Sequence, residues 1–161
     1  MQPLNHTTHV HTTTGKIWAA IPHGSRTNIS SISGNLTAIV VPFGAASQDD
    51  PSQLHTSADQ GSTFVSLYDA PLDSLEGYYD PLLKLRSTHT VKEGALELRY
   101  PYSWYGHLEA RILHGALKFD SSALEDFEKG DGFVKATKGT QGDSVMEANV
   151  DTGRLAILVG L

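Results

Sequence analysis

The chain has 161 residues, the size of one ordinary domain, and 39% of them are hydrophobic. Twelve Lys and Arg against 18 Asp and Glu give a net charge of -6. The sequence has no dense cluster of basic residues that could bind phosphates, which argues against a nucleic-acid partner. The absence of cysteine excludes disulfides and thiolate metal sites, and no apolar run approaches the roughly 18 residues of a membrane-spanning helix.

One short pattern recurs along the chain. A strand rich in Ser and Thr is followed by a glycine, one variable residue, an aliphatic residue and a second short apolar strand. In chain order the copies centre on Gly15, Gly34, Gly61, Gly94, Gly115 and Gly153. Because glycine adopts positive φ without a Cβ penalty, we expect a sharp bend at each copy. The aliphatic residue two places later then points inward, so we expect one dry interior lined by Ile17, Leu36, Leu96, Leu117 and Leu155.

Three longer stretches interrupt the pattern. Residues 45–53, 69–81 and 120–132 are polar or charged and contain proline or glycine, so they predict irregular loop excursions from a regular frame. Within the last of them a short helix is expected from Ser122 to Lys129. No other window sustains a helical apolar stripe.

The chain is therefore expected to be all-β, as one domain over residues 1–161. A parallel β-solenoid and an antiparallel β-sandwich both fit that expectation, and we favour the solenoid because the same local sequence recurs at the same bend. The apolar stretch 155–161 ends while still in the pattern of a buried strand, which allows the chain to be a piece of a longer protein.

The repeated residues resemble the adhesin-like domain family of bacteria and fungi. The hallmark of that family is a Thr/Ser-rich strand, a small residue, a glycine and an aliphatic residue two positions on, and the copies at Gly15, Gly34 and Gly153 match it well. The resemblance extends from about His9 to Gly160, with departures at the Gly94 and Gly115 copies. It implies a β-solenoid or related all-β fold and a role in adhesion, with no catalytic residue and no cofactor to carry over.

Four aromatic residues gather between two of the copies. Tyr100, Tyr102, Trp104 and Tyr105 are rigid and amphipathic, so they are candidates for a flat platform that binds sugar rings or a protein. The alternative is that some of them cap the end of the core.

Histidines suggest a second kind of site. His9 and His11 fall on one side of a strand, as a metal-binding pair does, but two ligands are too few for a zinc centre, so the alternative is a solvated terminal strand. His55, His89, His107 and His114 lie in or beside separate copies and would stack along one face only if the frame aligned them. No metal and no other cofactor is predicted.

The acidic residues predict no catalytic site. Asp49, Asp50, Asp59, Asp69, Asp73, Asp126, Asp131 and Asp143 are spread over the excursions and turns without the spacing of a calcium loop. Paired carboxylates perform glycosidase chemistry only at a defined separation across a cleft.

The functional expectation is a non-enzymatic, adhesin-like binding or structural module that presents a polar face, built by the repeat, to a glycan or a protein. The alternative is a carbohydrate-active lyase or hydrolase on a β-helix scaffold. Self-association is expected through exposed strand edges near Val10 and at residues 155–161. The expected cellular location is the cell surface if the chain belongs to a longer exported protein, and the cytoplasm otherwise.

Overall fold

The computed structural model describes residues 6–43, 49–71, 80–120, 122–140 and 142–160, and it is all-β. Its strands are β1 (Thr7–Thr14), β2 (Ile17–His23), β3 (Arg26–Ser33), β4 (Leu36–Pro42), β5 (Ser52–Leu67), β6 (Leu85–Tyr100), β7 (Gly106–Asp120), β8 (Glu125–Gly130), β9 (Phe133–Lys138) and β10 (Ser144–Val159). One 3-10 turn, η2 (Pro81–Lys84), precedes β6. In the part of the chain described, no helix has the length and apolar character required to span a membrane.

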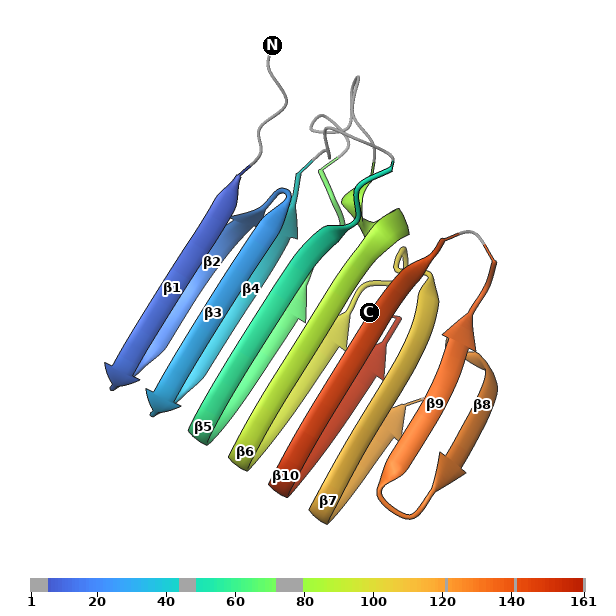
Figure 1. Cartoon of the computed structure of the whole chain (residues 1–161). Coiled ribbons are helices and arrows are strands. Elements are labelled where there is room, and N and C mark those ends of the chain that lie inside the picture. The colour runs from blue at the N-terminus through green and yellow to red at the C-terminus, as the bar shows by residue number, and fades with distance from the viewer. Residues whose placement is uncertain (1–5, 44–48, 72–79, 121, 141, 161) are drawn as a thin grey trace.

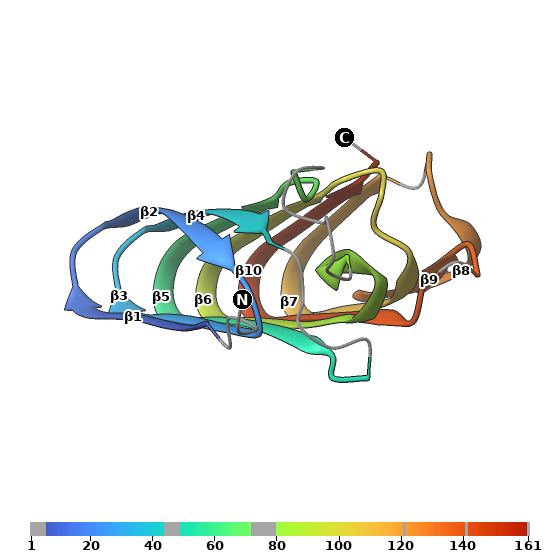
Figure 2. The same cartoon turned by 90° about the horizontal axis from the view of Figure 1, so that it is seen from above.

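The basic unit of the fold is an arc, which we define as a strand, a glycine bend and a second strand that returns over the first. β1 and β2 form one arc, β3 and β4 another, and β5, β6, β7 and β10 are each long enough to contain a whole arc. The arcs stack side by side as a mostly parallel, unclosed sheet that folds into two facing layers (Figures 1 and 2). The first layer holds the halves that precede the bends, and the second layer holds the halves that follow them.

Each bend depends on glycine for its positive φ, and every bend after the first depends on it for a second, steric reason. The bend glycines have positive φ, from 111° at Gly15 to 142° at Gly94. They also stack directly on one another, so that a Cβ built on Gly94 would lie 1.9 Å from the carbonyl oxygen of Gly61. A side chain there is both strained and sterically excluded.

The interior rows follow from the period-two alternation on either side of the bends. The aliphatic row predicted from the sequence is confirmed, because the ladders pair Ile17 with Leu36, Leu96 with Leu155 and Leu155 with Leu117. Thr63 occupies the same row between Leu36 and Leu96. Leu36, Leu96 and Leu155 are fully buried, and Ile17 and Leu117 at the two ends are partly buried.

The arcs do not stack in the order of the sequence. β10, the last strand, lies between β6 and β7, which therefore do not touch each other as neighbours. Its first residue is tied to the turn before β6, because the Ser144 hydroxyl donates to the Leu82 carbonyl oxygen at 2.6 Å and accepts from the Leu85 amide at 2.8 Å. The expectation that residues 155–161 offer a free strand edge is wrong as far as residue 158, because β10 is paired with both β6 and β7 up to that residue.

The helix expected from Ser122 to Lys129 is also wrong. Residues 125–130 form β8, which pairs with β9 in an antiparallel hairpin next to the first half of β7. The reason is the turn formed by Asp131 and Gly132, where Gly132 has a φ of 74°. An Asp-Gly pair between two strands favours a tight hairpin turn, and that local preference prevails over the short helical pattern from Ser122 to Lys129.

Two of the expected excursions are described only in part. Residues 49–51 and 69–71 are irregular, and Ser52 and Gln53 already belong to β5. Residues 44–48 and 72–79 lie outside the described residues, and with them Asp73.

Candidate binding face

The aromatic group Tyr100, Tyr102, Trp104 and Tyr105 does not form one platform. Tyr100 and Trp104 are fully buried, and their rings pack edge to face with centroids 5.7 Å apart. Tyr102 is 62% exposed and Tyr105 is half-buried. The alternation from Gly94 explains the burial, because Leu96, Leu98 and Tyr100 all point inward.

Tyr102 and Tyr105 share a lysine. The Lys138 ammonium lies 3.8 Å from the centre of the Tyr102 ring and 4.9 Å from the centre of the Tyr105 ring, and it donates to the Tyr102 carbonyl oxygen. Partial burial lowers the pKa of Lys138. The faces of these two rings are therefore engaged by a cation of the same chain, which disfavours them as a surface for sugars.

The frame does not align His55, His89, His107 and His114 along one face. His55 lies on the outer side of the first layer, His89 is fully buried inside it, His107 is exposed near the start of β7, and His114 is exposed beside the bend. Within the described ranges, no group of three His, Cys, Asp or Glu residues is placed to hold a metal ion.

His89 belongs to a polar network inside the core. Its Nδ1 lies 2.7 Å from the Thr56 hydroxyl, and its Nε2 lies 2.8 Å from the Tyr100 hydroxyl. Burial, with a smaller effect of His55, lowers the pKa of His89 to about 3, and burial raises the pKa of Tyr100. Both groups therefore stay neutral near pH 7, and the network satisfies buried polar atoms rather than facing a ligand.

His9 and His11 lie on the outer side of β1, as the alternation predicts. His9 pairs in register with Asn28, and the Nδ1 atom of His11 lies 2.8 Å from the hydroxyl of Ser30. Across the residues that the structure describes, no third ligand joins them. Their described contacts are with the neighbouring strand.

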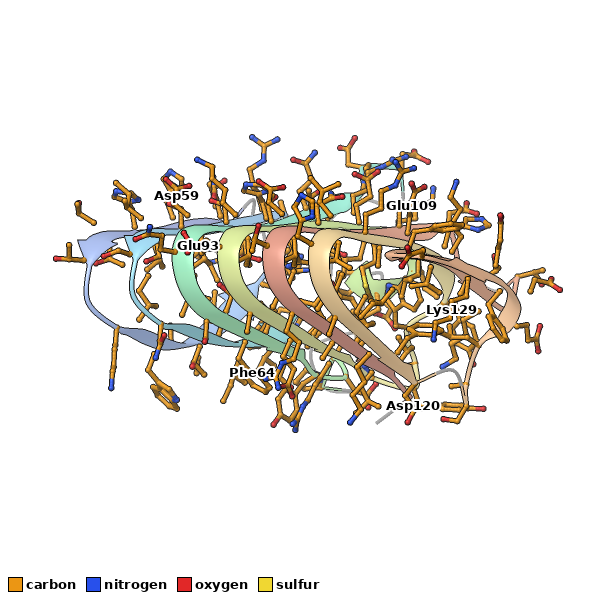
Figure 3. The ribbon with its side chains drawn as sticks, turned by 90° about the horizontal axis from the view of Figure 1, so that it is seen from below. Asp59, Phe64, Glu93, Glu109, Asp120 and Lys129 are labelled. Atoms are coloured by element: carbon orange, nitrogen blue, oxygen red, sulfur yellow. The ribbon has the colours of Figure 1, made fainter. Side chains whose placement is uncertain are left out.

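Some of the acidic residues lie beside a lysine near the bends. Asp59 forms an ion pair with Lys92 at 2.8 Å, and Asp151 and Glu93 line the same shallow hollow (Figure 3). Asp69 accepts a hydrogen bond from the Ser103 hydroxyl. Asp126 and Asp131 lie in the β8–β9 hairpin, where Asp126 has a φ of 44°.

The feature that the stacking does create is a flat polar surface on the outer side of the first layer. Its residues lie four and six positions before the bend glycines of β3, β5, β6 and β10. Together they form what we call the polar face: Asn28, Ser30, His55, Ser57, Thr88, Thr90, Glu147 and Asn149. They stand in two straight rows, because the ladders hold the four strands in exact register and neighbouring strands are about 4.8 Å apart.

The polar face carries hydroxyl, amide and imidazole groups with one charged residue, Glu147. Of its eight described residues, seven are half-buried against their neighbours and Glu147 is exposed. The sequence analysis predicts a polar face built by the repeat but names none of these residues, although the fixed offset from each glycine points to them.

The outer side of the second layer has the opposite character. Trp18 is 72% exposed and Tyr68 is 52% exposed, while Ile39, Val41 and Phe64 are half-buried beside them. Phe64 points away from the molecule on the side opposite to Asp59 and Glu109 (Figure 3). This apolar character is confined to β2, β4 and β5, because Glu97, Arg99, Lys118 and Arg154 make the same side charged over β6, β7 and β10.

In comparisons with known proteins, the chain matches no family model, no curated protein sequence and no solved structure. Its function is therefore inferred from these surfaces.

Proposed function

We propose that this chain is a β-solenoid binding module of the adhesin type, which presents its polar face to a glycan. The solenoid description is supported by the parallel stacking of similar arcs and by the aligned bend glycines. The sandwich alternative would place two separate sheets face to face, whereas here each arc passes from one layer to the other through its own bend.

The single observation that carries the proposal is the register of the polar face. Asn28 pairs with His55, His55 with Thr88, and Thr88 with Glu147, and the second row runs in the same way from Ser30 to Asn149. Rows of donors and acceptors at a constant spacing suit a polymer whose hydroxyl groups also repeat. A protein partner would favour a surface with an apolar centre, which this face lacks.

The enzyme alternative has less support. A glycosidase needs one carboxylic acid held protonated and a second carboxylate across the sugar. The carboxylates that come together, Asp59, Glu93 and Asp151, surround a lysine in a shallow hollow, and Asp59 is already paired with it. We therefore propose a binding role and no catalytic one.

The test is a pair of matched variants measured on a glycan array and by titration calorimetry with the best ligand. Thr90→Arg places a bulky side chain in the centre of the polar face, and Thr37→Arg makes the same change on the outer side of the second layer. Both threonines are half-buried in strands. We expect the Thr90 variant to lose at least tenfold in affinity and the Thr37 variant to bind like the unmodified protein.

Three outcomes would contradict the proposal. They are no binding to any glycan on the array, an equal loss in the two variants, or a loss in the Thr37 variant alone. Capture of a protein in place of a glycan, lost in the Thr90 variant, would keep the face and change the ligand class.

A further inference from the structure

The two ends of the stacked sheet differ in a way that points to a partner. At one end, the β8–β9 hairpin pairs with residues 106–111 of β7 and so occupies that half of the edge. At the other end, β1 pairs only with β3 and β2 pairs only with β4, as far as the described residues go. We call the open side of β1 and β2 the N-terminal edge (Figure 1).

The N-terminal edge exposes backbone hydrogen-bonding groups in both layers. The His6 carbonyl oxygen accepts from the Arg26 amide, and the Ile17 amide donates to the Asn35 carbonyl oxygen, so these residues direct their backbone groups toward the covered side. The backbone N–H and C=O groups of successive residues point to alternate sides of a strand. The groups that point toward the open side therefore belong to His9 and His11 in β1 and to Trp18 and Ala20 in β2. Unpaired groups of this kind are a template for another strand.

The end of the core is also open there. Val10, Ile17 and Ala19 belong to the interior rows but are only partly buried, whereas Ile29, Leu36 and Ala38 in the next arc are completely buried. The bend is equally accessible. A Cβ on Gly15 would meet nothing within 4 Å, although the corresponding atom on Gly34 would lie 1.7 Å from the Gly15 carbonyl oxygen.

The charge pattern favours a second copy of the same chain. Neither Thr7–Thr14 nor Ile17–His23 contains Asp, Glu, Lys or Arg, although the chain as a whole has a net charge of -6. Across a twofold axis the residues in the middle of β1 meet their own copies, and the others meet other residues of the same strand. A neutral edge can therefore meet itself without repulsion, and threonines across from one another pair well in sheets. The lysine that usually protects an edge strand is missing from both strands.

The shape of the edge adds a second argument. It consists of two strands in two layers, so a complete cover must supply two strands at the same separation. The N-terminal edge of a second copy does this, whereas the opposite end cannot, because β9 already fills half of it.

We propose that two copies of the chain associate through their N-terminal edges, with each β1 antiparallel to the β1 of the other copy and each β2 antiparallel to the other β2. Such a dimer is closed, and it joins the two polar faces into one longer surface. The proposal does not depend on glycan binding, because the oligomeric state is measured without any ligand.

The test compares two lysine variants by analytical ultracentrifugation over a hundredfold range of concentration. His11→Lys places a charge on the edge strand, close to its counterpart across the twofold axis. Ser57→Lys places the same charge in the same row two strands farther in, since His11 pairs with Ser30 and Ser30 with Ser57. We expect the unmodified chain and the Ser57 variant to reach about twice the monomer mass of 17.4 kDa, and the His11 variant to remain a folded monomer.

Amide hydrogen exchange provides the second measurement. The amides of His9 and His11 face the open side, so we expect their protection to rise with protein concentration in the unmodified chain and to stay low in the His11 variant. A monomer at every concentration, species larger than the dimer, or equal dissociation of both variants would overturn the proposal. Protection of these amides that does not change with concentration would overturn it as well, because it would show that the same chain covers the edge.

Discussion

At the scale of single residues, the interior contains a few polar atoms whose surroundings differ sharply. Thr56 and Thr63 are both fully or almost fully buried threonines of β5. The Thr56 hydroxyl lies 2.7 Å from Nδ1 of His89, whereas the Thr63 hydroxyl, in the otherwise aliphatic row, finds no hydrogen-bond partner among the described residues. A buried polar atom without a partner keeps its desolvation cost.

Replacing these threonines by valine should therefore have opposite effects. We expect Thr63→Val to raise the free energy of unfolding by about 1 kcal/mol, because it removes an unpaired hydroxyl at nearly constant volume. We expect Thr56→Val to lower it by about 1 to 3 kcal/mol, because it leaves the Nδ1 atom of His89 unpaired. Urea unfolding followed by circular dichroism measures both, and a change of the same sign in the two variants would contradict this account.

The buried histidines predict how stability depends on pH. Burial lowers the pKa of His23 to about 4, and burial is also the main reason that the pKa of His89 falls to about 3. In the unfolded chain both titrate near 6.5, so between that pH and the folded values the unfolded state binds more protons. Stability is then complete above pH 6.5 and is lost as the pH falls through this window.

We expect unfolding at pH 5 to require roughly 2 kcal/mol less per buried histidine than at pH 7.5. Denaturant titrations at the two pH values measure the difference, and His23→Asn should remove about half of it. Equal free energies of unfolding at both pH values would refute the neutral burial of these side chains.

At the scale of elements, the arc is set by its glycine, and the position of an arc in the stack decides how much a side chain there costs. Gly15 and Gly94 have similar positive φ values, 111° and 142°. They differ in what lies next to them, because Gly15 is at the N-terminal edge and Gly94 is stacked against Gly61. The same substitution can therefore separate backbone strain from steric exclusion.

We expect Gly15→Ala to lower the free energy of unfolding by about 1 to 3 kcal/mol, which is the cost of the strained φ alone. Gly94→Ala adds a collision with the Gly61 carbonyl oxygen, and we expect a loss of more than about 4 kcal/mol or no folded protein. Thermal unfolding of the two variants gives the comparison. Similar losses in both would show that the bends are not stacked as described.

The elements also show what sequence alone can predict. The offset from each glycine is enough to place Ile17, Leu36 and Leu155 in one row, because alternation on both sides of a bend is a local property. It also places Tyr100 inside, although the cluster of aromatic residues around it suggested a surface site. The hairpin of β8 and β9 was predictable from Asp131 and Gly132, but the charged residues before them suggested a helix.

At the scale of the whole molecule, the neighbours of each arc are set by the path of the chain rather than by the repeat. The copies at Gly94, Gly115 and Gly153 have similar sequence patterns. The local sequence therefore does not indicate that the arc of Gly153 lies between the other two arcs. For the same reason the offset from each glycine points to the residues of the polar face, but their order across the face is not known until the order of the arcs is known. It includes residues of β3 and of β10, which are more than 100 residues apart in the chain.

The central position of β10 constrains how the protein is made. A chain synthesised only as far as residue 143 contains β6 and β7, but it lacks the strand that will lie between them. Stacking from the N-terminus can therefore advance only as far as β6 until β10 has been synthesised, because β7 joins the stack through β10. Until then β6 presents an unpaired strand edge, and a chaperone that assists this protein would bind there.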